Sequence, residues 1–156
     1  MAWPMIIAGF PGIGKTSSAR LSPHHIKDLD SSTFSKTQDG TVNLSFPANY
    51  VAAMVQCSEP VILISSHRLV RDTLRIHSIA YTLVFPLREC RDEYRVRYEQ
   101  RGSSLSLIET IEQNWDAWID ECEAETFPTK IRLGSRQFLS DAIGVMRDSV
   151  GDRFPT

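Results

Sequence analysis

The sequence has little of what disulfide frameworks, zinc sites and membrane segments require. Its three cysteines are scattered and form no C-x-x-C pair, so neither a disulfide framework nor a structural zinc site is indicated. No apolar run approaches the length that spans a bilayer, and no basic region precedes the apolar N-terminus. Internal repeats, low-complexity tracts and linkers are also missing. We therefore expect a soluble, cytoplasmic protein.

An excess of charge of one sign is missing too. The formal net charge of -2 at pH 7 gives no overall attraction to nucleic acid or to an anionic membrane. Any site for a polyanion must therefore be local. The chain has 156 residues, 42% of them hydrophobic and 23% charged, which is typical of one globular domain. We predict a single domain over residues 1–156.

The sequence does contain the motif G-x-x-x-x-G-K-T, from Gly9 to Thr16. In such a loop the backbone N–H groups turn inward around phosphate, and the following helix points its positive end at the same anion. Lys15 is expected to reach the β and γ phosphates of ATP or GTP, and the Thr16 hydroxyl to supply a ligand to Mg²⁺. The residues predicted to bind the phosphates are Gly9, Pro11, Gly12, Ile13, Gly14, Lys15, Thr16 and Ser17.

Short apolar runs alternate with helical patterns along the rest of the chain. Strands are predicted at residues 2–8, 26–30, 61–65, 81–85 and 130–133. Helices are predicted at residues 17–21, 47–57, 67–77, 87–101, 103–125 and 136–148. This alternation favours right-handed crossovers and a sheet covered on both faces. The expected fold is α/β, a three-layer P-loop NTPase fold with a five-stranded parallel sheet and a small helical lid at about residues 88–104.

Missing motifs narrow the class of nucleotide-binding protein. A D-x-x-G switch and an N-K-x-D guanine-reading motif do not occur in suitable positions, which disfavours a GTP switch. The run at residues 61–65 continues as Ser66 and His67, with no carboxylate. The chain therefore lacks the acidic residue that ATP-hydrolysing enzymes use at this position to activate water. Transfer of a phosphoryl group to a hydroxyl or phosphate acceptor remains.

Two acidic residues, Asp28 and Asp30, lie at the end of the second predicted strand, where ligands bind in open α/β sheets. Asp30 lies nearer the carboxyl end, and we predict that it is the general base for an acceptor hydroxyl or an outer-sphere partner of Mg²⁺. An Asx turn explains Asp30 equally well. Asp28 is expected to be structural.

Two arginines four residues apart, Arg97 and Arg101, precede Gly102 and two serines. Both guanidinium groups are expected to project from one side of a helix into a hinge. There the pair can bind the transferring phosphoryl group and exclude water as a lid closes. The other charged residues of this helix have the spacing of a solvated face with ion pairs.

Basic residues on the acceptor side begin with Arg68, just after the third predicted strand. Arg68 can receive an acceptor phosphate. Together with Arg71 and Arg75 it can instead follow a nucleic-acid backbone. An exposed face paired with Asp72 explains Arg71 and Arg75 at least as well.

Aromatic and amide side chains are the other candidates. Phe34 and Asn49 border the presumed acceptor cleft and can stack on a base or form hydrogen bonds with it. Trp115 and Trp118 belong to the apolar stripe of a helix, so we expect them in the core rather than in contact with a ligand.

The order of these features resembles the small P-loop kinases, which include shikimate, gluconate and nucleoside-monophosphate kinases: the phosphate loop, an acid after the second strand and R-x-x-x-R-G before a long helix. The segments D-L-D-S-S, S-F-P-A-N-Y, S-S-H-R and N-W-D-A-W also look like compact nucleotide-kinase-like proteins of bacteriophages. The resemblance implies ATP as the donor, Mg²⁺ as the cofactor, a lid that carries Arg97 and Arg101, and an adenine-contacting loop from Gly134 to Arg136. One departure is that residues 31–60 contain no arginine for an acceptor phosphate.

The sequence therefore predicts an ATP-dependent kinase that acts on a nucleotide or nucleoside-type acceptor. Two other acceptors stay open, a hydroxylated modified base within phage DNA and a small hydroxyl metabolite. A non-catalytic nucleotide-binding regulatory module is the alternative from another class, because no carboxylate follows Ile64. No membrane partner is expected.

Overall fold

A computed structural model of the chain describes residues 4–150, with only the backbone described from residue 145 onward. Residues 1–3 and 151–156 belong to the predicted domain, and residues 2 and 3 to the predicted first strand, but they lie outside the described residues. The strands are β1 (Met5–Gly9), β2 (Ile26–Asp28), β3 (Val61–Ser65), β4 (Thr82–Pro86) and β5 (Thr129–Leu133). They form one sheet in the order β2-β3-β1-β4-β5, and every neighbouring pair is parallel. The predicted α/β class with a five-stranded parallel sheet is confirmed.

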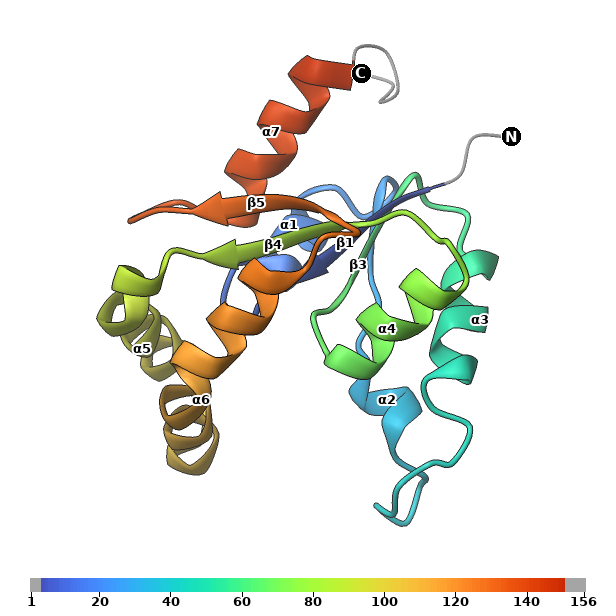
Figure 1. Cartoon of the computed structure of the whole chain (residues 1–156), viewed down its shortest axis with the longest axis horizontal. Coiled ribbons are helices and arrows are strands. Elements are labelled where there is room, and N and C mark those ends of the chain that lie inside the picture. The colour runs from blue at the N-terminus through green and yellow to red at the C-terminus, as the bar shows by residue number, and fades with distance from the viewer. Residues whose placement is uncertain (1–3, 151–156) are drawn as a thin grey trace.

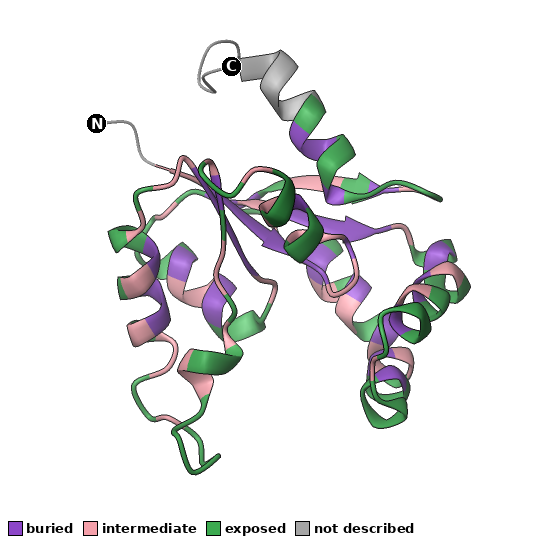
Figure 2. Ribbon diagram, turned by 180° about the vertical axis from the view of Figure 1, so that it is seen from behind, coloured by how far each residue is buried: buried purple, intermediate pink, exposed green. Residues whose placement is uncertain are grey.

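Helices connect the strands and cover both faces of the sheet. They are α1 (Lys15–Leu21), α2 (Ser32–Ser35), α3 (Ala48–Gln56), α4 (Arg68–Ile76), the 3-10 helix η1 (Arg88–Cys90), α5 (Arg91–Gln100), α6 (Leu105–Ala124) and α7 (Leu139–Val150). With right-handed crossovers, the strand order places α1 and α7 on one face and α3, α4 and α6 on the other. Figures 1 and 2 show these two layers from opposite sides. The short helix α2 was not predicted.

The core lies on both sides of the central strands. β3 is buried from Val61 to Ile64, because a strand with helices on both faces has no polar side to offer water. Figure 2 shows the central strands as continuously buried. On α6 the predicted apolar stripe is buried at Ile108, Ile111, Trp115 and Ile119. The helical period of the sequence therefore identified the packed face of this helix.

Parallel strands bring all their carboxyl ends to one edge of the sheet. The phosphate-loop motif follows β1 there, Asp30 follows β2, and His67 follows β3 and caps α4 by accepting a hydrogen bond from Leu69 N. The predicted lid region forms η1 and α5, which pack beside α6 in Figure 1. Among residues 4–150, no helix combines the length and the apolar character that crossing a bilayer requires.

Candidate functional site

The motif from Gly9 to Thr16 forms a tight loop between β1 and α1. Gly12 has φ 87° and Gly14 has φ 99°, a region that L side chains rarely adopt. A Cβ atom on Gly12 would also lie 2.7 Å from Cε1 of Tyr98, closer than carbon atoms approach. The close packing of α5 against the loop therefore requires glycine at this position.

The carbonyl groups of this loop bond to donors of the protein. The bonds are Lys15 Nζ to Gly9 O (2.7 Å), Tyr98 OH to Pro11 O (2.8 Å), Arg97 Nη1 to Gly12 O (3.0 Å) and Leu139 N to Ile13 O (2.7 Å). The loop is thus held by α5, by its own lysine and by the first residue of α7. Its carbonyl oxygens are turned toward the protein body.

Most backbone N–H groups of the same segment are free by contrast. In the part of the chain that the structure describes, no acceptor bonds to the amides of Gly12, Gly14, Lys15, Thr16 and Ser17. Backbone amides without an internal partner need another acceptor, such as water or a bound anion. A loop with bonded carbonyls and free amides is an arrangement that suits an anion.

The Lys15 ammonium group lies among charges of both signs. Burial lowers its pKa to about 8, Asp28 raises it, Arg101 lowers it and Asp30 raises it. These groups act on the pKa because they lie near the lysine. The structure therefore gathers four predicted features at one place: the loop lysine, the two carboxylates and one lid arginine.

Thr16 donates a hydrogen bond from its hydroxyl to Asp28 Oδ2 at 3.0 Å. Sequence reasoning gave Asp28 a structural role, whereas the structure joins it to the residue predicted to bind Mg²⁺. The available signal was the period of two in the predicted strand at residues 26–30, which puts Asp28 and Asp30 on one face, although β2 itself ends at Asp28. The packing of α1 against β2 then brings Thr16 to Asp28.

Asp30 forms the Asx turn that was the alternative to a catalytic role. Its Oδ1 accepts a hydrogen bond from Ser32 N at 2.9 Å, and Thr33 Oγ1 bonds to its backbone oxygen at 3.0 Å. These contacts fix the start of α2. Asp30 is exposed and follows β2 at the carboxyl edge of the sheet, where ligands bind in open α/β folds.

The two predicted lid arginines have different surroundings. Arg97 is only 11% exposed and donates to Gly12 O and to Gln137 O (2.8 Å), with its guanidinium stacked between the rings of Tyr94 and Phe138. Arg101 follows α5, is exposed and bonds to Ser103 Oγ at 2.8 Å. The expectation that both project together into a hinge is wrong for this conformation. Arg97 stabilises the phosphate loop through its hydrogen bond to Gly12 O, and Arg101 is the one of the two arginines that is accessible to solvent.

The expected adenine-contacting loop follows β5. Glu93 Oε1 accepts hydrogen bonds from Ser135 Oγ (3.0 Å) and from Arg136 N (2.9 Å), and Arg136 has φ 62°. These bonds tie the loop to α5. The Arg136 side chain is exposed beside the segment that Arg97 joins to the phosphate loop.

The predicted base-binding residues Phe34 and Asn49 are engaged within the protein. Asn49 donates from Nδ2 to Phe34 O (3.0 Å) and accepts from Tyr50 N (2.8 Å). Phe34 packs on the ring of Tyr50, which is fully buried and donates its hydroxyl to Leu29 O. These contacts join α2 to α3, so the structure gives both residues a packing role.

A cavity of about 290 Å³ opens at the carboxyl edge, between α4 and α6. Phe10 and Pro11 of the phosphate loop line it, and so do Arg68, Arg71 and Trp118. Trp118 packs against the core as expected but is only partly buried and also lines this cavity, whereas Trp115 is fully buried. The aromatic pattern could not separate these two residues, because both follow the same helical stripe.

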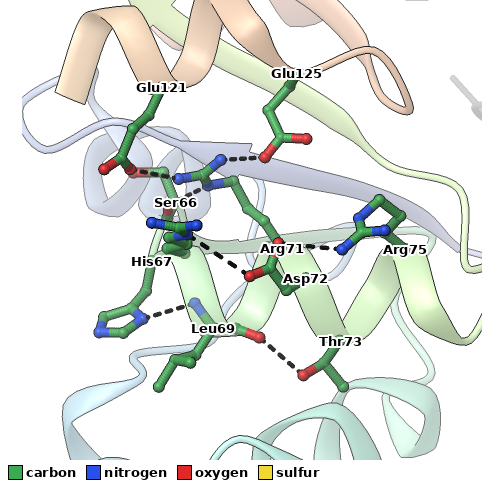
Figure 3. A network of polar contacts seen from close by, with 10 residues as sticks. Ser66, His67, Leu69, Arg71, Asp72, Thr73, Arg75, Glu121 and Glu125 are labelled. Atoms are coloured by element: carbon green, nitrogen blue, oxygen red, sulfur yellow. Dashed lines mark hydrogen bonds and ion pairs between the residues drawn. The ribbon is translucent and has the colours of Figure 1, made fainter. Parts of the chain in front are cut away.

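Arg71 is buried, not exposed as predicted. It is 3% exposed, donates from Nε to Ser66 O at 2.8 Å and pairs with Glu121 of α6 (3.0 Å) and with Glu125, the residue that follows α6 (Figure 3). Arg75 pairs with Asp72 at 3.6 Å on the surface, as expected. Because Arg71 is buried, the predicted basic stripe on α4 is interrupted.

No group of three or more His, Cys, Asp or Glu side chains that could hold a metal ion occurs among the described residues. A magnesium ion does not need one, because Mg²⁺ keeps several waters and binds through one or two carboxylates together with phosphate oxygens. Comparison with known proteins gave no match, neither to a protein-family model nor to a curated protein. The functional interpretation therefore depends on the geometry of the site.

Proposed function

We propose that the chain is a P-loop NTPase-type domain that works as an ATP-dependent phosphotransferase on a nucleotide or nucleoside-type acceptor. One observation carries the proposal: the carbonyl groups of residues 9–14 are bonded within the protein, whereas the amides of Gly12 and of residues 14–17 have no acceptor in the described part of the chain. A triphosphate suits such a loop, because its oxygens accept from several amides at once. Lys15 supplies the positive charge beside the same loop.

The donor set at Thr16 fits the magnesium ion that accompanies ATP. The Thr16 hydroxyl would be a direct ligand, and Asp28 would orient it and bind a coordinated water. Bound Mg²⁺ offsets the negative charge that develops on the phosphate oxygens during transfer. Lys15 would neutralise the same oxygens, and Arg101 is the accessible arginine near Lys15.

Transfer to an acceptor is favoured over hydrolysis by the cavity beside the loop. Phe10 and Pro11 are part of its lining, so a molecule bound there would lie next to the phosphates. Asp30, just after β2, would act as general base for an acceptor hydroxyl or as an outer-sphere partner of Mg²⁺. A free nucleotide is preferred to DNA because burial of Arg71 interrupts the basic stripe on α4.

Donor binding is tested by thermal unfolding with and without ATP and Mg²⁺. The ligands should raise Tm for the wild type and for Lys27→Ala, an exposed control on β2, but not for Lys15→Ala. Equal shifts in all three proteins would refute the donor site. Transfer is tested with γ-labelled ATP against nucleoside monophosphates, modified DNA and hydroxylated metabolites. Label in none of these acceptors would refute the kinase and favour a nucleotide-binding regulatory module.

A further inference from the structure

The cavity between α4 and α6 has an aromatic wall. Trp118 lines it and is only partly buried, and Phe10 lies beside Trp118 with ring centroids 6.3 Å apart. At about 290 Å³ the cavity is near the lower end of the usual range for ligand sites. This volume suits a flat ring with a sugar rather than a whole dinucleotide. Aromatic walls bind flat heterocycles by stacking.

One wall of this cavity combines a buried guanidinium with a partly exposed carboxylate. The buried guanidinium of Arg71 lies between the carboxylates of Glu121 and Glu125, as Figure 3 shows. Glu121 lines the cavity and is 40% exposed, whereas Glu125 is 16% exposed and is not part of the lining. Arg71 holds Glu121 through Oε2, and no other bond to this carboxylate occurs in the described part of the chain. Glu121 therefore presents a fixed acceptor to a ligand.

The lining also holds a second, solvent-exposed arginine, Arg68. Arg68 is 71% exposed, and among the described residues its guanidinium pairs only with Asp72, at 3.8 Å. A ligand that fits has a flat ring for Trp118, N–H donors for Glu121 and an anionic group for Arg68. A nucleoside monophosphate with an amino group on its base has all three. Uracil and thymine have one N–H between two carbonyl oxygens, and these oxygens repel a carboxylate that approaches the N–H.

We propose that this cavity binds the base of the acceptor nucleotide, with the ring against Trp118 and an amino-bearing edge on Glu121. Adenine, guanine and cytosine fit. The role as an acceptor site rests on the proposed function, but binding of the base does not. The base then lies on the α6 side of the phosphate loop, away from Phe34 and Asn49, whose polar and aromatic groups join α2 to α3.

The experiment measures binding of AMP, GMP, CMP and UMP by calorimetry without ATP. The wild type should bind at least one amino-bearing nucleotide ten or more times more tightly than UMP. Glu121→Gln should remove this preference, since a hydrogen bond to a charged group is lost. Glu125→Gln is the matched control, because it also pairs with Arg71 but does not line the cavity. It should keep the preference, and Trp118→Leu should weaken binding of every base by roughly tenfold.

Two results would overturn the proposal: equal binding of UMP and the amino-bearing nucleotides, or the same loss in Glu121→Gln and Glu125→Gln. Unfolding curves of each variant separate loss of fold from loss of binding. The outcomes also separate this proposal from the kinase. Base binding as expected without transfer of label would retain the cavity site and refute the kinase. If label is transferred to an acceptor whose binding is unchanged in Glu121→Gln and Trp118→Leu, the kinase is retained and the cavity site is refuted.

Discussion

Thr16 and Asp28 meet across the gap between α1 and β2, where the threonine hydroxyl donates to Oδ2 of the carboxylate at 3.0 Å. This contact joins the last residue of the phosphate-loop motif to the last residue of β2. No carboxylate follows β3, so under the proposed function Asp28 of β2 would be the acidic partner of the magnesium-binding hydroxyl.

Replacement of this acid should change the response to magnesium. We expect Asp28→Asn to raise the Mg²⁺ concentration for half-maximal phosphoryl transfer by about 10- to 100-fold, because the residue orients a metal ligand. Asp30→Asn, two residues further along the chain, is the matched variant and should lower kcat with little change in that concentration. Magnesium titrations of both variants check this. If both variants needed the same Mg²⁺ concentration for half-maximal transfer, Asp28 would have no specific role in binding Mg²⁺.

The lowered pKa of Lys15 predicts that ATP binding takes up a proton in mildly alkaline solution. In the free protein Lys15 loses its charge as the pH rises through about 8, because burial favours the neutral amine. A bound triphosphate favours the charged form and raises this pKa. Proton uptake should therefore be small well below pH 8, where the amine is already charged, and should approach one proton above it.

Calorimetry of ATP binding in two buffers with different ionisation enthalpies measures this uptake. Lys15→Met should bind more weakly and show no lysine-linked uptake at any pH. An uptake in the wild type that does not grow as the pH rises through about 8 would contradict the assigned pKa.

Alanine substitutions at two glycines should separate backbone strain from packing. Gly12 and Gly40 have similar φ angles, 87° and 85°, but a Cβ atom would meet Tyr98 at Gly12 and nothing within 4 Å at Gly40. Gly40→Ala should lower the free energy of unfolding by about 1–2 kcal/mol from strain alone. Gly12→Ala should cost a further 1–3 kcal/mol or so, because the extra carbon overpacks the loop against α5. Urea unfolding measures both, and equal losses would show that α5 does not press on the loop.

The two arginines at the end of α5 should have separable effects. Arg97→Ala removes charged hydrogen bonds to Gly12 O and Gln137 O, so it should lower stability by about 1.5–3 kcal/mol and weaken ATP binding. Arg101→Ala should leave stability nearly unchanged, because its side chain is exposed. Under the proposed function it should reduce kcat by orders of magnitude with ATP affinity retained. Unfolding curves and single-turnover rates of the two variants test this. If Arg101→Ala lowered stability and Arg97→Ala lowered only kcat, the roles assigned to the two arginines would be reversed.

The strands and most helices could be predicted from the sequence because their signals are local. Apolar runs such as residues 61–65 mark buried strands, and the helical spacing from Ile108 to Ile119 marks a packed face. The direct contact of Asp28 with Thr16 could not be predicted in this way. It depends on how α1 packs against β2, which joins residues 12 positions apart in sequence.

The burial of Arg71 could not be predicted for a similar reason. A basic residue on a helix is exposed in most proteins, and only the folded chain brings Glu121 of α6 and Glu125, the residue after α6, to the guanidinium, which makes burial of Arg71 tolerable. Trp118 shares its helical stripe with Trp115 and packs against the core as expected, but it is only partly buried. It therefore also lines the cavity, which the helical pattern does not reveal.

The sequence by itself determined the alternation of strands and helices and the position of the glycine-rich loop, since both follow from the spacing of neighbouring residues. Only the tertiary structure decided which side chains surround that loop. It placed Asp28 on Thr16, held Arg97 against Gly12 and opened a cavity between Arg68 and Glu121. These contacts join distant segments, and they exist because the parallel sheet brings the carboxyl ends of its strands to one edge.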